Sequence, residues 1–331
     1  MKKQSGFTLI ELAVVIVILT GLAVYGMEGL GNALDFKSRV DTDNRVKAWR
    51  KAIESVYLDN SATIDVQTTA ILKLVSGTTI NPATPATSGA SIGKCTMVAA
   101  SMLEFANRGG YSSTDMIQDG HHNSFCLYIT PRLSTTVSGT TLYYHSVAIV
   151  SPGRNGKVDA GTTLDAAGNL TLAAGSDDVG VLFDGRKFAS DRYNQTIAAM
   201  QRTVDAYSAY YAARYQSDGT RSLSNDYFSC GATTCPSTVA RWDTTSEMIS
   251  TCAGAITMVQ ATGTSPHTVL GLSSLDVTDG WGNLFTMDNC TNAVRSPAST
   301  IAARQNPPYT AQISATLPGG SVLSMTAVGQ I

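Results

Sequence analysis

The sequence predicts an α+β protein, in which a long N-terminal transmembrane and coil-forming helix precedes two tandem modules, each a helix packed on a small antiparallel sheet. Three observations support this fold class. An apolar run occupies the N-terminus. Two later segments carry apolar residues at alternating spacings of three and four, which indicates amphipathic helices. Each of those segments is followed by an Asp-Gly turn motif and then by strand-like runs.

The composition bounds the class of protein. The chain has 331 residues, of which 43% are apolar and only 15% charged, against a usual charged fraction of about 25%. Its formal net charge of −2 argues against a protein built on nucleic-acid binding, so no nucleic-acid partner is expected. The six cysteines, an even number, suit disulfides in an oxidising compartment. The profile indicates an extracytoplasmic protein of about two domains.

The N-terminal segment begins with Lys2 and Lys3 and becomes an apolar stretch over residues 7–25. At a rise of about 1.5 Å per residue, a helix of this length nearly spans a hydrocarbon core of about 30 Å. The lysines at its start hold that end in the cytoplasm, which places the rest of the chain outside. We therefore predict one helix over residues 7–60, with residues 7–30 crossing the membrane once.

Glu11 interrupts this apolar stretch. A carboxylate inside a membrane helix costs at least ~2.5 kcal/mol. One interpretation is a tolerated charge near the interface, and another is an ordinary secretory signal peptide. A signal peptide would end in a polar tail with a small-x-small cleavage site, whereas here the apolar run continues through Val24, Tyr25 and Met27.

Residues 5–25 resemble the class III signal of type IV pilins and of the pseudopilins of type II secretion. In that family a short basic leader ends in Gly, the next residue is usually Phe, and Glu stands at the fifth mature position. Gly6, Phe7 and Glu11 match these three elements. The resemblance implies that residues 1–6 are a leader, that a prepilin peptidase cleaves between Gly6 and Phe7, and that Phe7 is then N-methylated.

The resemblance also implies a function. It predicts a structural subunit, a pilin, of an extracellular type IV pilus-like filament, held in the inner membrane with its head outside the cytoplasm before assembly. The expected partners are further copies in a helical homopolymer, other pilins, the prepilin peptidase and an inner-membrane assembly platform. The alternatives are a minor or tip pilin acting as an adhesin, and a pseudopilin of a type II secretion system.

Glu11 has an assembly role in this interpretation. Cleavage creates an ammonium group at Phe7, at the depth of a carboxylate on a neighbouring subunit, and pairing the two offsets part of the burial cost of each. Glycines in the same helix favour either close helix packing or a segment that loses helical structure in the filament. They are Gly21, Gly26, Gly29 and Gly31.

Two amphipathic helices are predicted downstream. The first continues the N-terminal helix to Asn60, and the second begins near Ser190 or Asp191, either of which is a good N-cap. No spanning segment precedes the second helix, so it should pack on its own sheet. The first apolar stripe consists of Val46, Trp49, Ile53 and Val56, and the second of Ile197, Met200, Val204, Tyr207 and Tyr211.

A turn motif occurs once after each helix. Residues 119–125 read D-G-H-H-N-S-F and residues 279–285 read D-G-W-G-N-L-F, the latter resembling the D-x-W-G-N segment of major pseudopilins. The strand-like runs that follow are residues 125–130, 142–150 and 179–183 in the first half, and 284–287, 310–317 and 322–328 in the second. We predict a tandem duplication of a pilin-like head, over residues 61–188 and 189–331. A chance likeness of two Asp-Gly turns is the alternative.

The cysteines fit this duplication. Cys95 and Cys126 flank the first turn motif as Cys252 and Cys290 flank the second, which predicts the disulfides Cys95–Cys126 and Cys252–Cys290. The remaining pair would be Cys230–Cys235. Four cysteines in the second half allow three pairings, so this assignment stays open from spacing alone.

Catalytic and cofactor sites are not expected. No phosphate-binding glycine loop, nucleophile elbow or H-E-x-x-H motif is present, which argues against an enzyme. Asp159, Asp177 and Asp178, which follow a Gly- and Asn-rich stretch at residues 151–157, weakly resemble a pseudopilin calcium loop. The same residue types also simply form turns. The pair His121 and His122 is interpreted as part of an exposed turn and not as a metal site.

Overall fold

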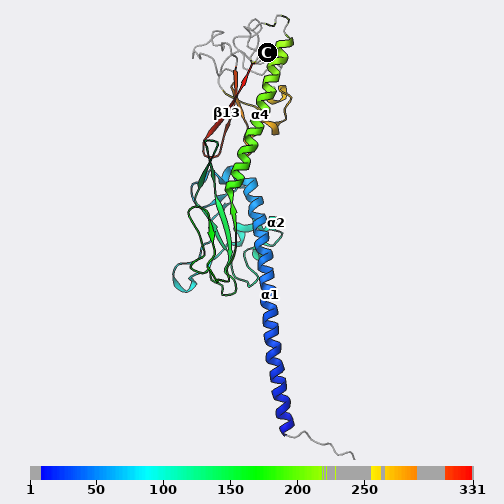
Figure 1. Cartoon of the computed structure of the whole chain (residues 1–331), viewed down its shortest axis with the longest axis vertical. Helices are drawn as coiled ribbons and strands as arrows, with labels where there is room; N and C mark the ends of the chain where they lie inside the picture. The colour runs from blue at the N-terminus through cyan, green and yellow to red at the C-terminus, as the bar shows by residue number, and fades with distance from the viewer. Residues whose placement is uncertain are drawn as a thin grey trace, which may run out of the picture. The chain divides into compact units, whose positions relative to one another are not determined.

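The computed structural model describes residues 9–217, 219, 221, 228, 255–261, 265–288 and 310–329, and of residues 9–12, 19, 21–30 and 256 it describes the backbone alone. The chain forms two compact units. The first contains residues 1–59, 70–130 and 146–183, and the second contains residues 60–69, 131–145 and 184–331. A long helix and small antiparallel sheets make up the described chain, as the α+β prediction requires (Figure 1).

Helix α1 runs from Leu9 to Ile64 as one element of 56 residues, drawn in blue in Figure 1. Its backbone is helical at all four glycines of the N-terminal half. The predicted apolar stripe is buried: Trp49 and Val56 are fully covered, and Ile53 is 1% and Val46 8% exposed. The helix passes the predicted end at Asn60 by one turn.

Among the described residues, no helix combines the length and the apolar character that a membrane span requires. Most of the predicted span at residues 7–30 falls outside the side chains that the structure describes. The described side chains in that segment are those of residues 13–18 and 20.

The first unit has a three-stranded sheet in the order β3-β6-β9. Strands β3 (Cys126–Ile129) and β6 (Ser146–Ser151) pair antiparallel, and β9 spans Val179–Asp184. The Trp49 ring of α1 packs against Phe105 and Phe125, with centroids 5.4 and 6.4 Å away. The smaller elements are β1 (Leu72–Lys73), β2 (Thr79–Ile80), η1 (Gly89–Ser91), η2 (Ala99–Met102), α2 (Leu103–Gly109), α3 (Ser113–Met116), β7 (Thr163–Leu164) and β8 (Leu170–Thr171).

The second unit has its own helix and sheet, as predicted. Helix α4 (Gly185–Ser217) lies with a four-stranded antiparallel sheet in the order β10-β11-β12-β13. The strands are β10 (Ile256–Thr257), β11 (Thr286–Asp288), β12 (Thr310–Thr316) and β13 (Val322–Val328), and the short helices are α5 (Pro266–Val269) and η3 (Ser274–Val277). The core joins Met200, Tyr207 and Tyr211 of α4 to Phe285 and Ile313.

The start of α4 was predicted near Ser190 or Asp191, which is wrong by about a turn and a half. The helix begins at Gly185, directly after β9. The Asp184 carboxylate accepts the backbone N–H of Arg186 at 2.9 Å. This side chain satisfies a donor of the first turn, so the helix starts five residues earlier.

The strand predicted over residues 142–150 is in fact two strands. Strand β5 (Thr140–Tyr144) pairs with β4 (Leu133–Val137) in a hairpin, and β6 starts after His145. Ser138 and Gly139 both have positive φ, 49° and 81°, which gives the twist of a two-residue hairpin turn. Leu142 and Tyr144 enter the second unit's core, whereas β6 belongs to the first unit. Residues 131–145 and 60–69 therefore group with the second unit, unlike the predicted division at residue 188.

Candidate functional site

The predicted processing site lies at the start of the chain. Gly6 and Phe7 are outside the described residues, and Glu11 is described only as part of the α1 backbone. Beyond it, five consecutive apolar residues are exposed on all sides of the helix: Val14 (54%), Val15 (42%), Ile16 (55%), Val17 (71%) and Ile18 (56%). An apolar helix that its own chain leaves uncovered is suited to burial in lipid or among other helices.

Apolar exposure continues further along α1. Leu34 is 65%, Phe36 70% and Val40 42% exposed. Phe36 and Val40 border a groove of about 800 Å³ in the first unit, between α1 and the loops that carry Gly153 and Asp177. The outward segment of α1 therefore also presents apolar surface that the single chain does not cover.

The first turn motif is fixed to α1 by a threonine. Asp119 Oδ1 accepts the N–H groups of His121 at 2.9 Å and Asn123 at 2.8 Å, which closes the turn. The Gly120 N–H then donates to Thr42 Oγ1 at 3.0 Å, and that hydroxyl donates to the carbonyl oxygen of Ser38 at 2.8 Å. A Cβ at residue 120 would overlap the Ser38 carbonyl, so this close approach requires glycine.

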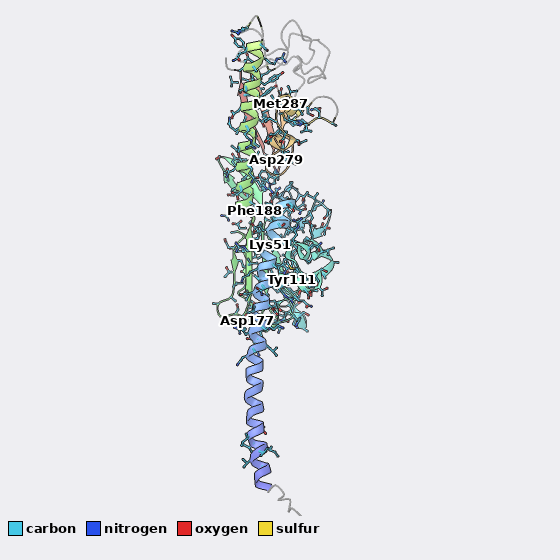
Figure 2. All side chains as sticks on the ribbon, turned by 90° about the vertical axis from the view of Figure 1, so that its right-hand side faces the viewer. Lys51, Tyr111, Asp177, Phe188, Asp279 and Met287 are labelled. Carbon is cyan, nitrogen blue, oxygen red and sulfur yellow. A yellow bond between two sulfur atoms is a disulfide. The ribbon has the colours of Figure 1, made fainter. Side chains whose placement is uncertain are left out.

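The second turn motif repeats this arrangement on α4 (Figure 2 shows Asp279 beside the helix). Asp279 Oδ1 accepts the N–H groups of Trp281 at 2.9 Å and Asn283 at 2.7 Å. The Gly280 N–H donates to Thr196 Oγ1 at 2.8 Å, and that hydroxyl donates to the carbonyl oxygen of Arg192, also at 2.8 Å. A Cβ at residue 280 would overlap that carbonyl. We call the glycine–threonine contact of each unit the helix latch.

The elements that lead into the two turns also match. Ser112 Oγ accepts the N–H of Asp115 at 3.1 Å at the start of α3, and Ser273 Oγ accepts the N–H of Asp276 at 3.3 Å at the start of η3. After each turn a phenylalanine is fully buried, Phe125 in one unit and Phe285 in the other. The likeness of the two segments thus extends well beyond the sequence motif.

A third D-x-x-x-N turn shows which part of this likeness is local. Asp165 Oδ1 accepts the N–H groups of Ala167 at 2.9 Å and Asn169 at 2.8 Å, as in the other two turns. Ala166, however, stands where Gly120 and Gly280 stand in the latched turns. An Asp and an Asn four residues apart are therefore sufficient to close the turn, and the glycine with its threonine partner distinguishes the two units.

Burial reverses the direction in which the pKa of the aspartate shifts in this shared turn. In the exposed turn, hydrogen bonds from Asn169 lower the pKa of Asp165. In the latched turn of the second unit, burial raises the pKa of Asp279, although Asn283 and Trp281 donate equivalent hydrogen bonds that lower it. Desolvation disfavours the carboxylate, and at Asp279 it outweighs the donors.

Trp281 also packs into a hydrophobic core of the second unit. Its side chain is 9% exposed, and Nε1 donates to Asp65 Oδ2 at 3.1 Å. Asp65 is the residue directly after α1 and belongs to the second unit, where it is 1% exposed. In the first unit, Trp49 Nε1 donates instead to the backbone carbonyl of Met116 at 2.7 Å.

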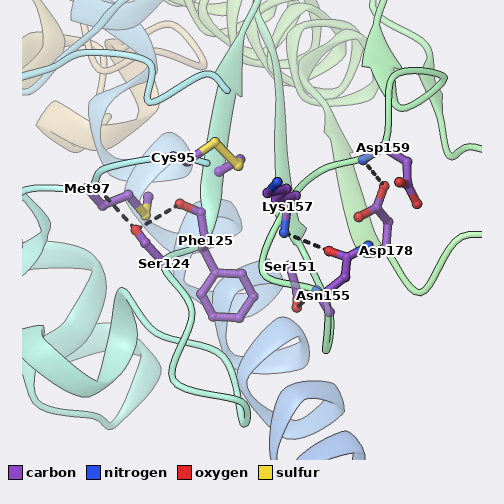
Figure 3. Close-up of a disulfide and its surroundings, with 11 residues drawn as sticks. Cys95, Met97, Ser124, Phe125, Ser151, Asn155, Lys157, Asp159 and Asp178 are labelled. Atoms are coloured by element: carbon purple, nitrogen blue, oxygen red, sulfur yellow. Dashed lines mark hydrogen bonds between the residues drawn. A yellow bond between two sulfur atoms is a disulfide. The ribbon is translucent and has the colours of Figure 1, made fainter. Parts of the chain in front are cut away.

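Cys95 and Cys126 form a disulfide with a Cα–Cα distance of 5.3 Å (Figure 3), which is the predicted pairing. It joins the loop before η2 to the first residue of β3, across a sequence separation of 31. The predicted pairs Cys230–Cys235 and Cys252–Cys290 lie outside the described residues.

The three aspartates proposed as calcium ligands do lie together. One carboxylate oxygen from each of Asp159, Asp177 and Asp178 falls within 4.8 Å of the others. Asp178 is 7% exposed; its Oδ2 accepts the Asp159 N–H at 3.1 Å and the Thr162 hydroxyl at 2.6 Å (the Asp159 bond is drawn in Figure 3). Its Oδ1 is buried and has no hydrogen-bond partner among the described residues.

This cluster fits a hard cation. Burial raises the pKa of Asp178, with Asp159 and Asp177 adding like-charge repulsion. Burial and the Asp178 charge together raise the pKa of Tyr128 to about 12. A buried carboxylate oxygen without a donor is costly, and a cation with oxygen ligands would satisfy it. Bound there, Ca²⁺ would be held by the three carboxylates and would neutralise their mutual repulsion.

His121 and His122 do not form a metal pair with these aspartates in the described part of the chain. His122 has a φ of 63°, in the left-handed region where the second turn has Gly282 with a φ of 89°. His121 lines the 800 Å³ groove beside α1. The two histidines are turn residues, as predicted.

The helix latch is the feature that sequence reasoning missed. Each helix does carry a threonine four residues before a stripe residue, Thr42 before Val46 and Thr196 before Met200. Aligning the two stripes by their spacing of three, four and three, however, pairs Val46 with Ile197 and so would have placed Tyr193, and not Thr196, opposite Thr42.

Comparison with known proteins finds a match at the N-terminus. Residues 1–20 match the family model of the prokaryotic N-terminal methylation motif. No curated protein and no solved structure matches the chain. The matched residues include Gly6, Phe7 and Glu11, so the match supports a class III prepilin-type signal at the start of this chain.

Proposed function

We propose that the chain is a structural subunit of an extracellular, type IV pilus-like filament. A prepilin peptidase removes residues 1–6, Phe7 is N-methylated, and the mature helix packs against those of other subunits. The observation that carries this proposal is an N-terminal methylation motif continuous with a helix whose apolar side chains are exposed all round. Keeping one Val or Ile side chain out of water contributes about 1.5–3 kcal/mol, so these side chains favour surroundings of lipid before assembly and of neighbouring helices after it.

The route and the partners follow from the same proposal. The precursor is held in the inner membrane with both units outside the cytoplasm, and an assembly platform extracts it into the filament. Copies of the chain and other pilins are the partners, and the role is structural and not enzymatic. The finer alternatives are a minor or tip pilin that acts as an adhesin, and a pseudopilin of a type II secretion system.

We further propose that the two units derive from one duplicated head. The matching latches at Gly120 and Gly280 support this, because the third turn at Asp165 shows that the Asp-Asn pattern alone does not bring a latch with it. The matching caps at Ser112 and Ser273 add an independent resemblance.

Replacing Glu11 tests the assembly proposal. Glu11→Gln should still enter the membrane and be processed, yet should sharply reduce the amount of filament, because the partner of the Phe7 ammonium is lost. Glu28→Gln, in the same helix, is the matched control and should assemble normally. Immunoblots of membranes and of sheared filaments measure both. Normal filaments from Glu11→Gln would refute the proposed assembly role of Glu11.

The abundance of this chain in sheared filaments distinguishes a major subunit from a tip adhesin. A major subunit should dominate sheared filaments, whereas a tip adhesin should be rare and its loss should abolish attachment. Deleting residues 190–331 is a poor test, because Leu142 and Tyr144 of the remaining hairpin would lose the core that buries them. Quantitative mass spectrometry of filaments from the unaltered chain avoids this problem.

A calcium site is a second candidate function, favoured by Asp178 Oδ1, which is buried and has no hydrogen-bond partner in the described part of the chain. Ca²⁺ should raise the melting temperature of the chain, and Asp159→Asn should abolish that rise, because one carboxylate ligand is lost. Asp165→Asn, in an exposed turn outside the cluster, is the control. An equal response of the two variants, or no response of the unaltered chain, would exclude the site.

A further inference from the structure

Strand β13 lies at one edge of the second unit's sheet, drawn in red in Figure 1. It pairs with β12 residue by residue from Val322 to Val328, without a bulge, and no other described strand pairs with it. The strand contains neither a charged residue nor a proline. Natural edge strands are usually short, or are protected by charges, prolines or bulges, because an open edge is a template for pairing with another chain. Strand β13 has none of these protections.

The other edges of the two larger sheets are different. Strand β10, at the opposite edge of the same sheet, has only two residues. In the first unit, Ala83 and Leu127 exchange backbone hydrogen bonds of 2.8 and 3.0 Å, which covers the edge of β3. Strand β9, at the other edge, ends in the acidic Asp184. A long, uncharged edge therefore distinguishes β13 among the edges of these two sheets.

The backbone groups that β13 presents outward can be assigned. The Leu317 N–H donates to the carbonyl oxygen of Ser321 at 2.8 Å, so these facing residues form a hydrogen-bonded pair. Hydrogen-bonded and non-hydrogen-bonded pairs alternate along an antiparallel ladder. Residues 323, 325 and 327 therefore bond to β12, whereas residues 322, 324, 326 and 328 point their N–H and C=O groups away from it.

These outward residues also carry the exposed side chains, and their order is self-complementary. Val322 is 63% and Val328 36% exposed, with the exposed Ser324 and Thr326 between them. If a second copy of β13 runs antiparallel along the edge with Met325 opposite Met325, each of these valines faces a valine, and each hydroxyl side chain faces another. Ser–Thr pairs hydrogen-bond across strands, and valine pairs bury apolar surface. No like charges meet, because the strand carries none.

From this geometry we propose that β13 pairs antiparallel with β13 of a second copy, across a two-fold axis at Met325, so that the sheets of two second units become continuous. The outward residues form the hydrogen-bonded pairs, and Met325 faces its own copy in a non-hydrogen-bonded pair. A two-fold contact of this kind closes on two copies and does not extend into a filament. It uses the second unit alone, so the proposal is independent of filament assembly.

Disulfide cross-linking of the purified full-length chain in detergent tests this register. In Met325→Cys, the Cα atoms of the two cysteines lie about 4.5 Å apart across the axis, which is within reach of a disulfide. Oxidation should therefore give a covalent dimer on a non-reducing gel. Ser314→Cys, on the same face of the neighbouring strand β12, is the matched control. It should give no more dimer than the unaltered chain, whose own cysteines set the background.

A mixture of two exposed variants tests the register without touching the core. Residue 324 of one copy faces residue 326 of the other in the proposed pairing. Equal amounts of Ser324→Cys and Thr326→Cys chains should therefore give more covalent dimer together than either chain gives alone.

Adding Thr326→Pro to Met325→Cys distinguishes strand pairing from chance collision. Residue 326 points its N–H outward, so proline removes a donor to the second copy without taking one from β12. The dimer fraction should fall at least about tenfold, because the ring also blocks the approach of the second strand. The melting temperature should stay unchanged; if it falls, the mixture of exposed variants carries the test.

The proposal is overturned if neither Met325→Cys nor the mixture exceeds the background. Equal cross-linking of Ser314→Cys would indicate stacked sheet faces, and more dimer from Ser324→Cys alone than from the mixture would indicate another register; either contradicts the proposal. A chain that does not cross-link, yet whose Ser324 and Thr326 amides are protected from hydrogen exchange, would assign the edge to a segment of the same chain. Because the chains are in detergent, none of these results depends on filament formation.

Discussion

The two units share one device and differ in what surrounds it. Each fixes an Asp-closed turn to its helix through a glycine N–H and a threonine hydroxyl. Around the latch of the first unit stand Arg45 and His122, and around that of the second stand Ala199 and Gly282. The latch therefore fixes the turn of each unit to its helix, whereas the residues next to the latch differ between the two units.

The latch glycines should give the largest effects. Gly120→Ala and Gly280→Ala each place a methyl group on a helix carbonyl, which can move only if the helix shifts, so each should destabilise its unit by about 3 kcal/mol. Gly219→Ala, where a Cβ meets nothing, is the control and should be close to neutral. Denaturant unfolding measures all three. Small effects of both substitutions would mean that the latch does not fix the turn of each unit to its helix.

Substitution of the two tryptophans should give the next largest effects, and these should differ between the units. Trp281→Phe removes the Nε1 donor of a buried carboxylate, Asp65, and should cost about 2 kcal/mol, whereas Trp49→Phe removes a donor from a backbone carbonyl and should cost about 1 kcal/mol. Adding Asp65→Asn to Trp281→Phe should recover part of the loss in a double-mutant cycle. Additive costs in that cycle would show that the pair is not coupled.

The left-handed turn position should give a smaller, opposite pair of effects. His122→Gly relieves a side chain held at a φ of 63° and should stabilise the first unit by about 0.5–1 kcal/mol. Gly282→His makes the reverse change at a φ of 89° and should destabilise the second unit by more than that. Shifts in melting temperature of the same sign for both variants would contradict the assignment of equivalent positions.

Two aspartates in the same kind of turn should respond oppositely to pH. The pKa of Asp165 is lowered, so its contribution to stability is present above its unfolded pKa and is lost as pH falls through the folded pKa. The pKa of Asp279 is raised, so its contribution is present below the unfolded pKa and is lost as pH rises through the folded value. Carboxyl chemical shifts in an NMR titration report both directions. Parallel titration would show that burial does not dominate at Asp279.

Much of the fold could be predicted because its signals are local. The apolar stripe from Val46 to Val56, the strands at residues 310–316 and 322–328, and the Cys95–Cys126 disulfide all follow from spacing and repetition. The strand break at His145 could not be predicted in this way, because its two sides serve different cores, and periodicity carries no information on which core a run joins.

The candidate sites likewise combine features that the sequence shows with features that depend on tertiary packing. The three aspartates could be picked out in the sequence, but the burial of Asp178 Oδ1 without a hydrogen-bond partner from any described residue is a property of tertiary packing. The difference between Arg45 and Ala199 has no signal of its own in the sequence, since a buried alanine on an apolar helix face is ordinary. The latches, which depend on tertiary packing, show that the two positions are equivalent.

Processing and assembly of the chain are tested most directly by the mass of its N-terminal peptide in sheared, purified filaments. If the chain is processed and assembled as proposed, the filament contains the chain beginning at an N-methylated Phe7, with residues 1–6 absent. Filaments that lack the chain, or a chain in them that still begins at Met1, would contradict it.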